Sequence, residues 1–67
     1  MAEEMAFSGQ RLRIMRESRG LSQRVLAAKM GVKPNYLSKW EAGSSPNGVN
    51  MVKLLRALEC ELEEVTE

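Results

Sequence analysis

Apolar residues recur three or four positions apart along this chain, separated by short polar stretches that contain glycine, serine or proline. This spacing predicts a protein built of short helices, each with one inward face. The helices are expected from about Gly9 to Ser18, Gln23 to about Met30, about Pro34 to Ala42–Gly43, and Asn47 to about Glu59, with one last turn over Glu61 to Val65. The expected inward residues are Leu12, Met15, Leu26, Ala27, Met30, Leu37, Trp40, Met51, Leu54, Leu55, Leu58, Leu62 and Val65.

The residues before each stretch support these boundaries. Ser8, Ser22 and Asn47 each carry an oxygen that can accept from the free amides of a first helical turn. Pro34 suits a first helical position because it has no amide hydrogen to leave unpaired. Lys33 then falls at the cap position although lysine offers no acceptor. It is either tolerated there or retained for contact with a ligand.

Gly31 separates the second and third expected helices. A steep turn between two helices needs a residue that tolerates positive φ, and Gly31 supplies it. The close approach of the two backbones needs a small residue, and Ala27 lies four positions earlier. The pattern is typical of a helix-turn-helix unit. A helical hairpin without a nucleic-acid role would explain the apolar positions, but not the polar outer face formed by Lys33, Asn35, Ser38 and Lys39.

Charge is unevenly distributed along the 67 residues, although the net charge is only +1. Residues 5–46 contain eight basic and two acidic side chains, a net charge of +6. Residues 47–67 contain two basic and five acidic side chains, a net charge of −3. Such a chain can offer one positive surface to a polyanion. The length predicts a single domain over residues 1–67, with residues 1–7 as a flexible tail.

The composition argues against several other classes of protein. Cys60 is the one cysteine, and the chain has no histidine and no aspartate. An internal disulfide is therefore impossible, and no metal site or cofactor is expected. The chain also lacks the convergent acid, base or nucleophile that an enzyme would need. The sequence shows no membrane span, signal segment or small-molecule site. A reducing cytoplasm, on the DNA of the nucleoid, is the expected location.

The segments RLRIMRESRGLSQ, LAAKMGV, YLSKWEAG and VKLLRALE, with a proline loop before the last, resemble the Cro and phage-repressor type of helix-turn-helix proteins, the Xre-like family. The resemblance extends from Gly9 to Val65. It implies an all-α fold, a compact bundle of five short helices like the lambda-repressor DNA-binding domain. It also implies a regulator of transcription, usually a repressor, that binds double-stranded DNA as a homodimer on a palindromic operator.

The resemblance assigns roles to individual residues. Gln23 resembles the family residue that grips a phosphate and buttresses the recognition helix. Arg16 and Glu41 resemble a pair that the family joins as a salt bridge, which would be either partly buried or exposed. The positions facing the major groove are Lys33, Pro34, Asn35, Ser38 and Lys39. Three residues depart from the family pattern, namely Lys33 and Glu61, where a hydroxyl residue is common, and Pro34, where a polar base reader is common.

The chemistry of these side chains suggests how DNA would be read. Asn35 suits a bidentate contact to adenine, Lys39 a contact to guanine, and Pro34 an apolar contact to a thymine methyl group. Candidates for phosphate contacts are Arg11, Arg24, Lys29, Lys33 and Tyr36. For Arg24 and Lys29, solvated helix surface is an equal alternative. For Tyr36, packing alone is an equal alternative.

One module of this size reads few base pairs, so a symmetric dimer is expected on DNA. Its contact is expected from the C-terminal end of the fourth helix with the Leu62–Val65 turn, or instead from Ile14 or Val25. A protein-interaction module on the same fold, such as an antitoxin or a coactivator-like partner, is the rival function. The sequence leaves open a Cro-like phage repressor, a restriction–modification controller and an antitoxin, and it does not give the operator or an inducer.

Overall fold

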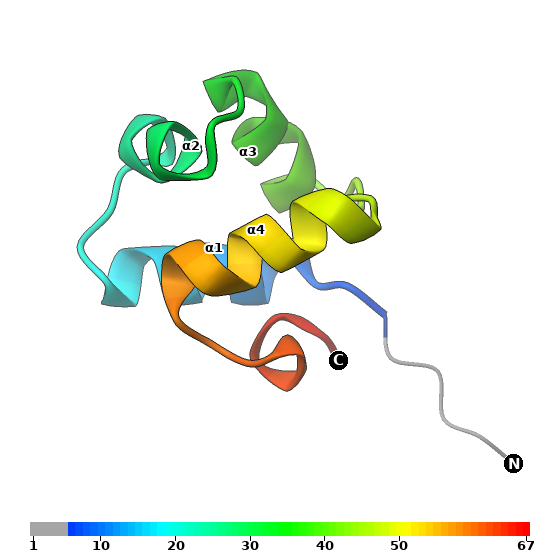
Figure 1. Cartoon of the computed structure of the whole chain (residues 1–67). Helices are drawn as coiled ribbons and strands as arrows, with labels where there is room; N and C mark the ends of the chain where they lie inside the picture. Colours follow the sequence, from blue (N-terminus) through cyan, green and yellow to red (C-terminus); the bar gives the residue numbers. More distant parts are fainter. Residues whose placement is uncertain (1–5) are drawn as a thin grey trace, which may run out of the picture.

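The computed structural model describes residues 6–67, which form four α-helices and one short 3-10 helix. They are α1 (Gly9–Ser18), α2 (Gln23–Met30), α3 (Pro34–Glu41), α4 (Gly48–Leu58) and η1 (Leu62–Val65). Helix α3 packs against α1 and α2, α4 packs against α2, and η1 packs against α1 (Figure 1). The all-α prediction is confirmed. The expectation of five helices is corrected, because the fifth element is a single 3-10 turn of four residues.

Three of the four α-helices begin at the expected caps. The Ser8 and Ser22 hydroxyls each accept from the amide three residues later, at 3.1 Å. The side chain of Asn47 accepts from the Asn50 amide at 2.8 Å. Lys33 precedes α3 and makes no side-chain cap, with Pro34 as the first helical residue. Helix α3 therefore starts without the local stabilisation that the other three helices have.

Most of the predicted inward positions meet in one core, whereas Leu55 is only half-buried and lies outside the cluster. Leu12, Leu26, Leu37, Leu54 and Leu58 are fully buried, and Ala27, Met30 and Trp40 complete the cluster. Met15 and Met51 pack against it from its edge. Of the last two predicted core residues, Val65 is buried, whereas Leu62 is 41% exposed and the prediction for it is wrong. A single 3-10 turn presents only a narrow face to α1, and Val65 occupies that face.

The two ends of the described chain lie side by side. Phe7 and Thr66 form an isolated antiparallel bridge, and the Ser8 amide donates to the Val65 carbonyl at 2.8 Å. The Ser8 hydroxyl also donates to the Glu67 carboxylate at 2.8 Å. The expected flexible tail over residues 1–7 is therefore corrected for Ala6 and Phe7, which pair with the last residues of the chain. Residues 1–5 lie outside the described part.

Gly9 is the point at which the start of α1 meets the end of α3. A Cβ atom at Gly9 would lie 2.7 Å from the carbonyl oxygen of Glu41 and closer still to the carbonyl oxygen of Trp40. Both atoms belong to the backbone, so a side chain at this position would push α1 and α3 apart. Gly48 occupies the matching first position of α4, but a Cβ atom there would meet open space.

We therefore expect Gly9→Ala to lower the free energy of unfolding by about 1–3 kcal/mol, because the added methyl group overpacks a backbone contact. Gly48→Ala is the matched control, and it should leave stability unchanged or raise it slightly because alanine favours a helix over glycine. Urea denaturation followed by circular dichroism measures both. Equal effects of the two substitutions would contradict the close contact between α1 and α3.

Candidate nucleic-acid interface

The turn between α2 and α3 has the geometry that the sequence predicts. Gly31 ends α2 with φ 75° and ψ 29°, in the left-handed region. The Val32 amide then donates to the Ala27 carbonyl at 3.0 Å, which closes the end of α2. Ala27 is fully buried, and Val32 packs on the core just after the corner. The glycine corner and the small buried side chain let α3 cross α2 at close range.

Helix α3 divides cleanly into two faces. Leu37 and Trp40 point into the core, with Trp40 only 4% exposed. The five residues predicted to face a major groove are all exposed, namely Lys33, Pro34, Asn35, Ser38 and Lys39. Trp40 is therefore a core residue and offers no open ring face for stacking on a base. The outer face of α3 carries two amines, an amide and a hydroxyl, groups suited to hydrogen bonding with base edges and phosphates.

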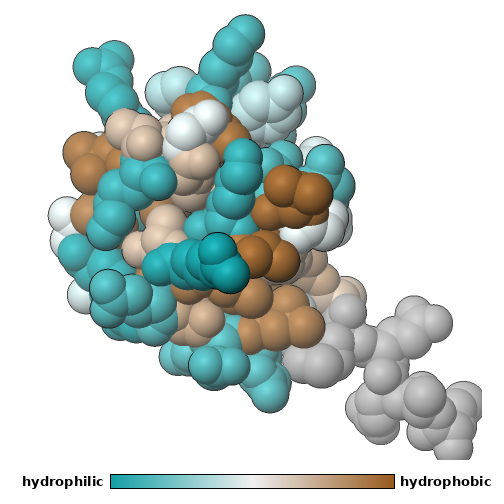
Figure 2. Space-filling view, viewed as in Figure 1, coloured by the Kyte–Doolittle hydropathy of each residue, from teal (hydrophilic) through white to brown (hydrophobic). Residues whose placement is uncertain are grey.

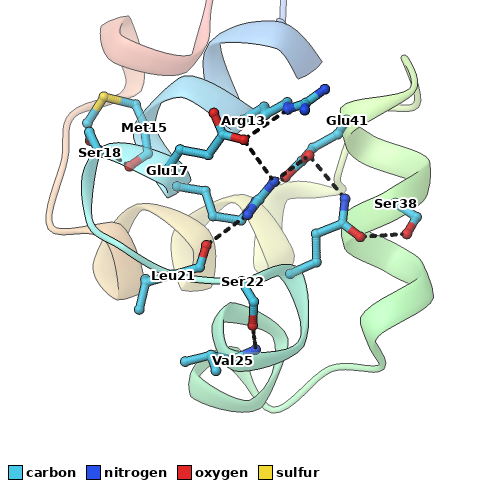
Figure 3. Close-up of polar contacts among 11 residues, drawn as sticks. Arg13, Met15, Glu17, Ser18, Leu21, Ser22, Val25, Ser38 and Glu41 are labelled. Atoms are coloured by element: carbon cyan, nitrogen blue, oxygen red, sulfur yellow. Dashed lines mark hydrogen bonds and ion pairs between the residues drawn. The ribbon is translucent and has the colours of Figure 1, made fainter.

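An ion pair between α1 and the end of α3 fixes the orientation of α3. Arg16 Nε lies 2.6 Å from Glu41 Oε2, and Arg16 Nη2 donates to Glu41 Oε1 at 3.1 Å (Figure 3). The two side chains are only 11% and 8% exposed. The third guanidinium nitrogen donates to the Leu21 carbonyl at 2.8 Å. The hydrogen bond to Glu41 raises the pKa of Arg16 and outweighs the opposing effect of burial, so this guanidinium stays charged.

Gln23, at the start of α2, extends this ion pair to the outer face of α3. Its Nε2 donates to Glu41 Oε1 at 3.1 Å, and its Oε1 accepts from the Ser38 hydroxyl at 2.9 Å. We call Arg16, Glu41, Gln23 and Ser38 the anchoring network. It connects α1, α2 and α3 through side chains alone, and it includes one of the five exposed residues of α3. Buttressing of α3 by Gln23 is thus a direct feature of the structure.

The predicted phosphate-contacting residues do not all lie together. Arg24 is exposed in the first turn of α2, next to Gln23. Arg11 instead lines a hollow of about 370 Å³ with Ile14, Met15 and Glu64, beside η1. Lys29 lines a second hollow with residues of α4. The structure therefore brings Gln23 into contact with α3, leaves Arg24 exposed beside it in the chain, and places Arg11 and Lys29 beside other elements.

Tyr36 is both packed and accessible. Its ring centroid lies 5.8 Å from that of Trp40, with the two rings tilted by 33°. The residue remains 41% exposed. The aromatic contact holds the Tyr36 ring at the edge of the bundle, next to the polar face of α3.

Arg19 has a structural role that sequence reasoning missed, since its position suggested only the end of α1. Its Nε donates to the Leu58 carbonyl at 2.9 Å, and its Nη2 donates to the Glu59 carbonyl at 3.3 Å. The guanidinium thereby joins the end of α1 to the end of α4. Nothing in the local sequence signals this contact, because the two helix ends are about forty residues apart.

Residues 6–67 contain no group of three histidine, cysteine or acidic side chains placed to hold a metal ion. No helix in this range has the length and apolar character required to cross a bilayer. The polar face of α3, with the anchoring network behind it, is the best-defined candidate site in the described chain.

Comparison with known proteins gives consistent matches. The sequence profile of the family described as Helix-turn-helix matches residues 12–65. The restriction–modification controller protein C.AhdI from Aeromonas hydrophila is 41% identical, with a TM-score of 0.79 over 85% of this chain and 88% of that one. The search of curated proteins found no match.

Two more solved structures are similar, and both were determined with DNA. The P22 c2 repressor protein, in complex with a synthetic operator, is 35% identical, with a TM-score of 0.74 over 79% of this chain and 82% of that one. The master regulator for biofilm formation SinR, in complex with DNA, is 33% identical, with a TM-score of 0.74 over 79% of this chain and 87% of that one.

The anchoring network predicts a large effect of removing one charge. Glu41→Gln should lower the free energy of unfolding by roughly 3 kcal/mol, because it removes the buried counter-charge of the Arg16 guanidinium and leaves only the distant, exposed Glu17 carboxylate. Glu17→Gln is the matched control, since Glu17 is 54% exposed and lies 3.9 Å from Arg16. It should cost no more than about 1 kcal/mol. Thermal and urea unfolding measure both, and similar losses would contradict the special role of Glu41.

Proposed function

Because the chain belongs to the helix-turn-helix family of the Cro and phage-repressor (Xre-like) type, we propose that it binds duplex DNA sequence-specifically and regulates transcription. Helix α3 would enter the major groove with its N-terminal half against the base edges. One observation carries the proposal: the outer face of α3 is polar and exposed while the anchoring network holds its inner side. A recognition helix must be held in position before it meets DNA, and the anchoring network holds α3 in this way.

The base contacts follow from side-chain chemistry. We assign Asn35 a bidentate contact to adenine and Lys39 a contact to guanine. Pro34 offers only an apolar surface, suited to a thymine methyl group. The Ser38 hydroxyl donates its proton to Gln23 and keeps its lone pairs free to accept from a base. Lys33 lies at the entry of α3, within reach of a base edge or a phosphate.

The phosphate contacts are assigned from the surroundings of each side chain. Gln23 uses one amide hydrogen for Glu41 and keeps the other for a phosphate oxygen. Arg24, adjacent to it, is the best cationic candidate, and the partly exposed Tyr36 hydroxyl is a further donor. Arg11 and Lys29 lie beside η1 and α4, so we assign them general electrostatic attraction of DNA rather than a close contact.

Relatives that were solved on DNA support a repressor, and the size of one reading module supports a dimer. The P22 c2 protein is a repressor bound to an operator, and SinR is a regulator bound to DNA. Each α3 contacts only a few base pairs, whereas specific operator binding usually needs two half-sites about one helical turn apart. We therefore propose a homodimer on a palindromic operator, acting on DNA in the cytoplasm.

Selection of bound fragments from random duplexes at physiological salt tests this proposal directly. The wild-type chain should enrich one palindromic sequence and bind it with strong salt dependence. Asn35→Ala should relax the preference at one or two base pairs, at a cost of about 1–3 kcal/mol on the selected site. Gel-shift titrations on the selected site and on single-base variants measure the change.

Arg24→Ala provides the contrasting variant. It should weaken binding to all sequences alike and reduce the slope of log affinity against log salt by about 1. Circular dichroism should show the wild-type helix content for both variants, since both side chains are exposed. A correctly folded wild-type chain with no salt-sensitive duplex binding would reject the proposal and favour the protein-interaction module, such as an antitoxin.

A further inference from the structure

Ser38 is the exposed residue of α3 whose hydroxyl already has a partner within the fold. It lies three residues after Asn35 and four after Pro34, so it shares their side of the helix. In the view that Figures 1 and 2 share, α3 lies at the upper end of the molecule, and hydrophilic side chains project around it. A hydroxyl has one proton and two lone pairs, so the group that it can read in a ligand depends on where its proton goes.

The proton of Ser38 is directed away from the outer surface of α3. The hydroxyl donates to Gln23 Oε1 at 2.9 Å, so its proton points back to the start of α2 (Figure 3). Ser18, an exposed serine of α1, shows a local alternative, because its hydroxyl donates to the Met15 carbonyl of its own helix at 2.7 Å. The proton of Ser38 goes instead to a side chain of another helix. The orientation of that side chain therefore decides whether the bond can form.

Glu41 determines the orientation of the Gln23 amide. Glu41 is paired with the Arg16 guanidinium at 2.6 Å, and a carboxylate can only accept hydrogen bonds. Gln23 therefore turns its amide nitrogen to Glu41 Oε1, at 3.1 Å, and this leaves its own oxygen for Ser38. The reverse orientation of the amide would place two oxygens against each other in a half-buried site, without a hydrogen between them.

The hydrogen bonds of the anchoring network thus have a fixed direction. Arg16 and Gln23 both donate to Glu41, and Ser38 donates to Gln23. Because the guanidinium has no acceptor and the carboxylate has no donor, none of these bonds can be reversed while the ion pair is intact. A serine on a free helix surface can rotate its hydroxyl to donate or to accept. Ser38 offers only lone pairs to a ligand.

An acceptor in the major groove distinguishes two classes of base. Adenine and cytosine each present an exocyclic amino group there, with one hydrogen left over from base pairing. Guanine and thymine each present a carbonyl oxygen in the corresponding place. Every Watson–Crick pair contains one amino base and one keto base. An acceptor therefore reads which strand carries the amino base, and it does not distinguish an A·T pair from a C·G pair.

We propose that Ser38 selects an amino base, adenine or cytosine, on the strand that it contacts, and that Gln23 is the positioning residue that directs the Ser38 proton inward. This inference rests on the proposed function, which places Ser38 against the base edges without naming the class of base. It predicts one position of the operator half-site at which adenine and cytosine are both accepted and guanine and thymine are rejected. It also gives Gln23 an influence on sequence preference that a phosphate contact alone would not have.

Parallel selections from random duplexes, with the wild type and with Ser38→Ala, test the proposal. The base read by Ser38 is the position at which the two selected profiles differ. There the wild type should prefer adenine and cytosine about tenfold over guanine and thymine, and Ser38→Ala should accept all four bases. Ser38→Thr keeps the hydroxyl and should keep the preference. Ser18→Ala, which removes a hydroxyl from α1, is the control and should give the wild-type profile at every position.

Gln23→Met separates a positioning role from a merely structural one. Methionine is of similar length but has no amide, so the Ser38 proton becomes free to turn outward to a keto base. This variant should bind all sequences more weakly, because a phosphate contact is lost. At the Ser38 position alone, guanine and thymine should become as acceptable as adenine and cytosine. Uniform weakening with the preference intact, in a variant with the wild-type circular dichroism spectrum, would overturn the positioning role.

A modified duplex tests the class of base with the wild-type protein, so the result does not depend on the folding of a variant. The analogue 2-aminopurine pairs with thymine but lacks the amino group that adenine presents in the major groove. Placed at the Ser38 position of the selected operator, it should weaken wild-type binding about tenfold relative to adenine and leave Ser38→Ala unaffected. Equal wild-type binding to both duplexes, or selection of guanine or thymine at this position, would overturn the inference.

Failure of this inference and failure of the proposed function give different results. A wild-type chain that enriches one sequence, with a profile that Ser38→Ala leaves unchanged at every position, would reject the role of Ser38 and retain the proposed function. A correctly folded wild-type chain that enriches no duplex would reject the proposed function itself.

Discussion

The buried pair of Arg16 and Glu41 is the interaction on which the rest of the candidate site depends. Helix α3 is only eight residues long and begins without a side-chain cap, so it has little stability of its own. Leu37 and Trp40 attach it to the core, but two apolar contacts leave its rotation poorly determined. The guanidinium of Arg16 holds Glu41 at two points and so fixes the C-terminal end of α3 against α1. Gln23 and Ser38 carry this constraint to the exposed face.

The uneven distribution of charge along the chain separates the helices that we assign to DNA binding from the rest of the chain. The excess of positive charge lies in the part of the chain that contains α1, α2 and α3, and the acidic residues of the second part all follow α4, in residues 59–67. On our account, the first group of helices meets DNA.

Local features of the structure were predictable because local physics determines them. The bounds of α1 and α2, the caps at Ser8, Ser22 and Asn47, and the left-handed Gly31 follow from side-chain chemistry at single positions. Family resemblance supplied the pairing of Arg16 with Glu41, and the structure shows that it is buried rather than exposed. The expectation of a fifth α-helix failed because η1 has room for only one turn, of which Val65 alone reaches the core.

Features that depend on distant parts of the chain were not predictable. The pairing of Phe7 with Thr66 needs both chain ends in place, and no local pattern indicates it. The hollow lined by Lys29, Lys53 and Arg56 forms only when α2 and α4 pack together. Lys29 and Lys53 therefore appear unrelated in the sequence. The positive φ of Glu59, 53°, is likewise a feature of the folded end of α4 that the sequence does not indicate. In each case the missing information was tertiary contact rather than helix propensity.

The central claim is that α3, held by the anchoring network, is the surface that meets DNA. A heteronuclear NMR titration of the labelled chain with its selected duplex measures this most directly. The largest shifts should appear at backbone amides of residues 33–39, at the side-chain amide of Asn35 and at Gln23 and Arg24. Unperturbed α3 resonances, with shifts confined to α4 or η1, would contradict the account.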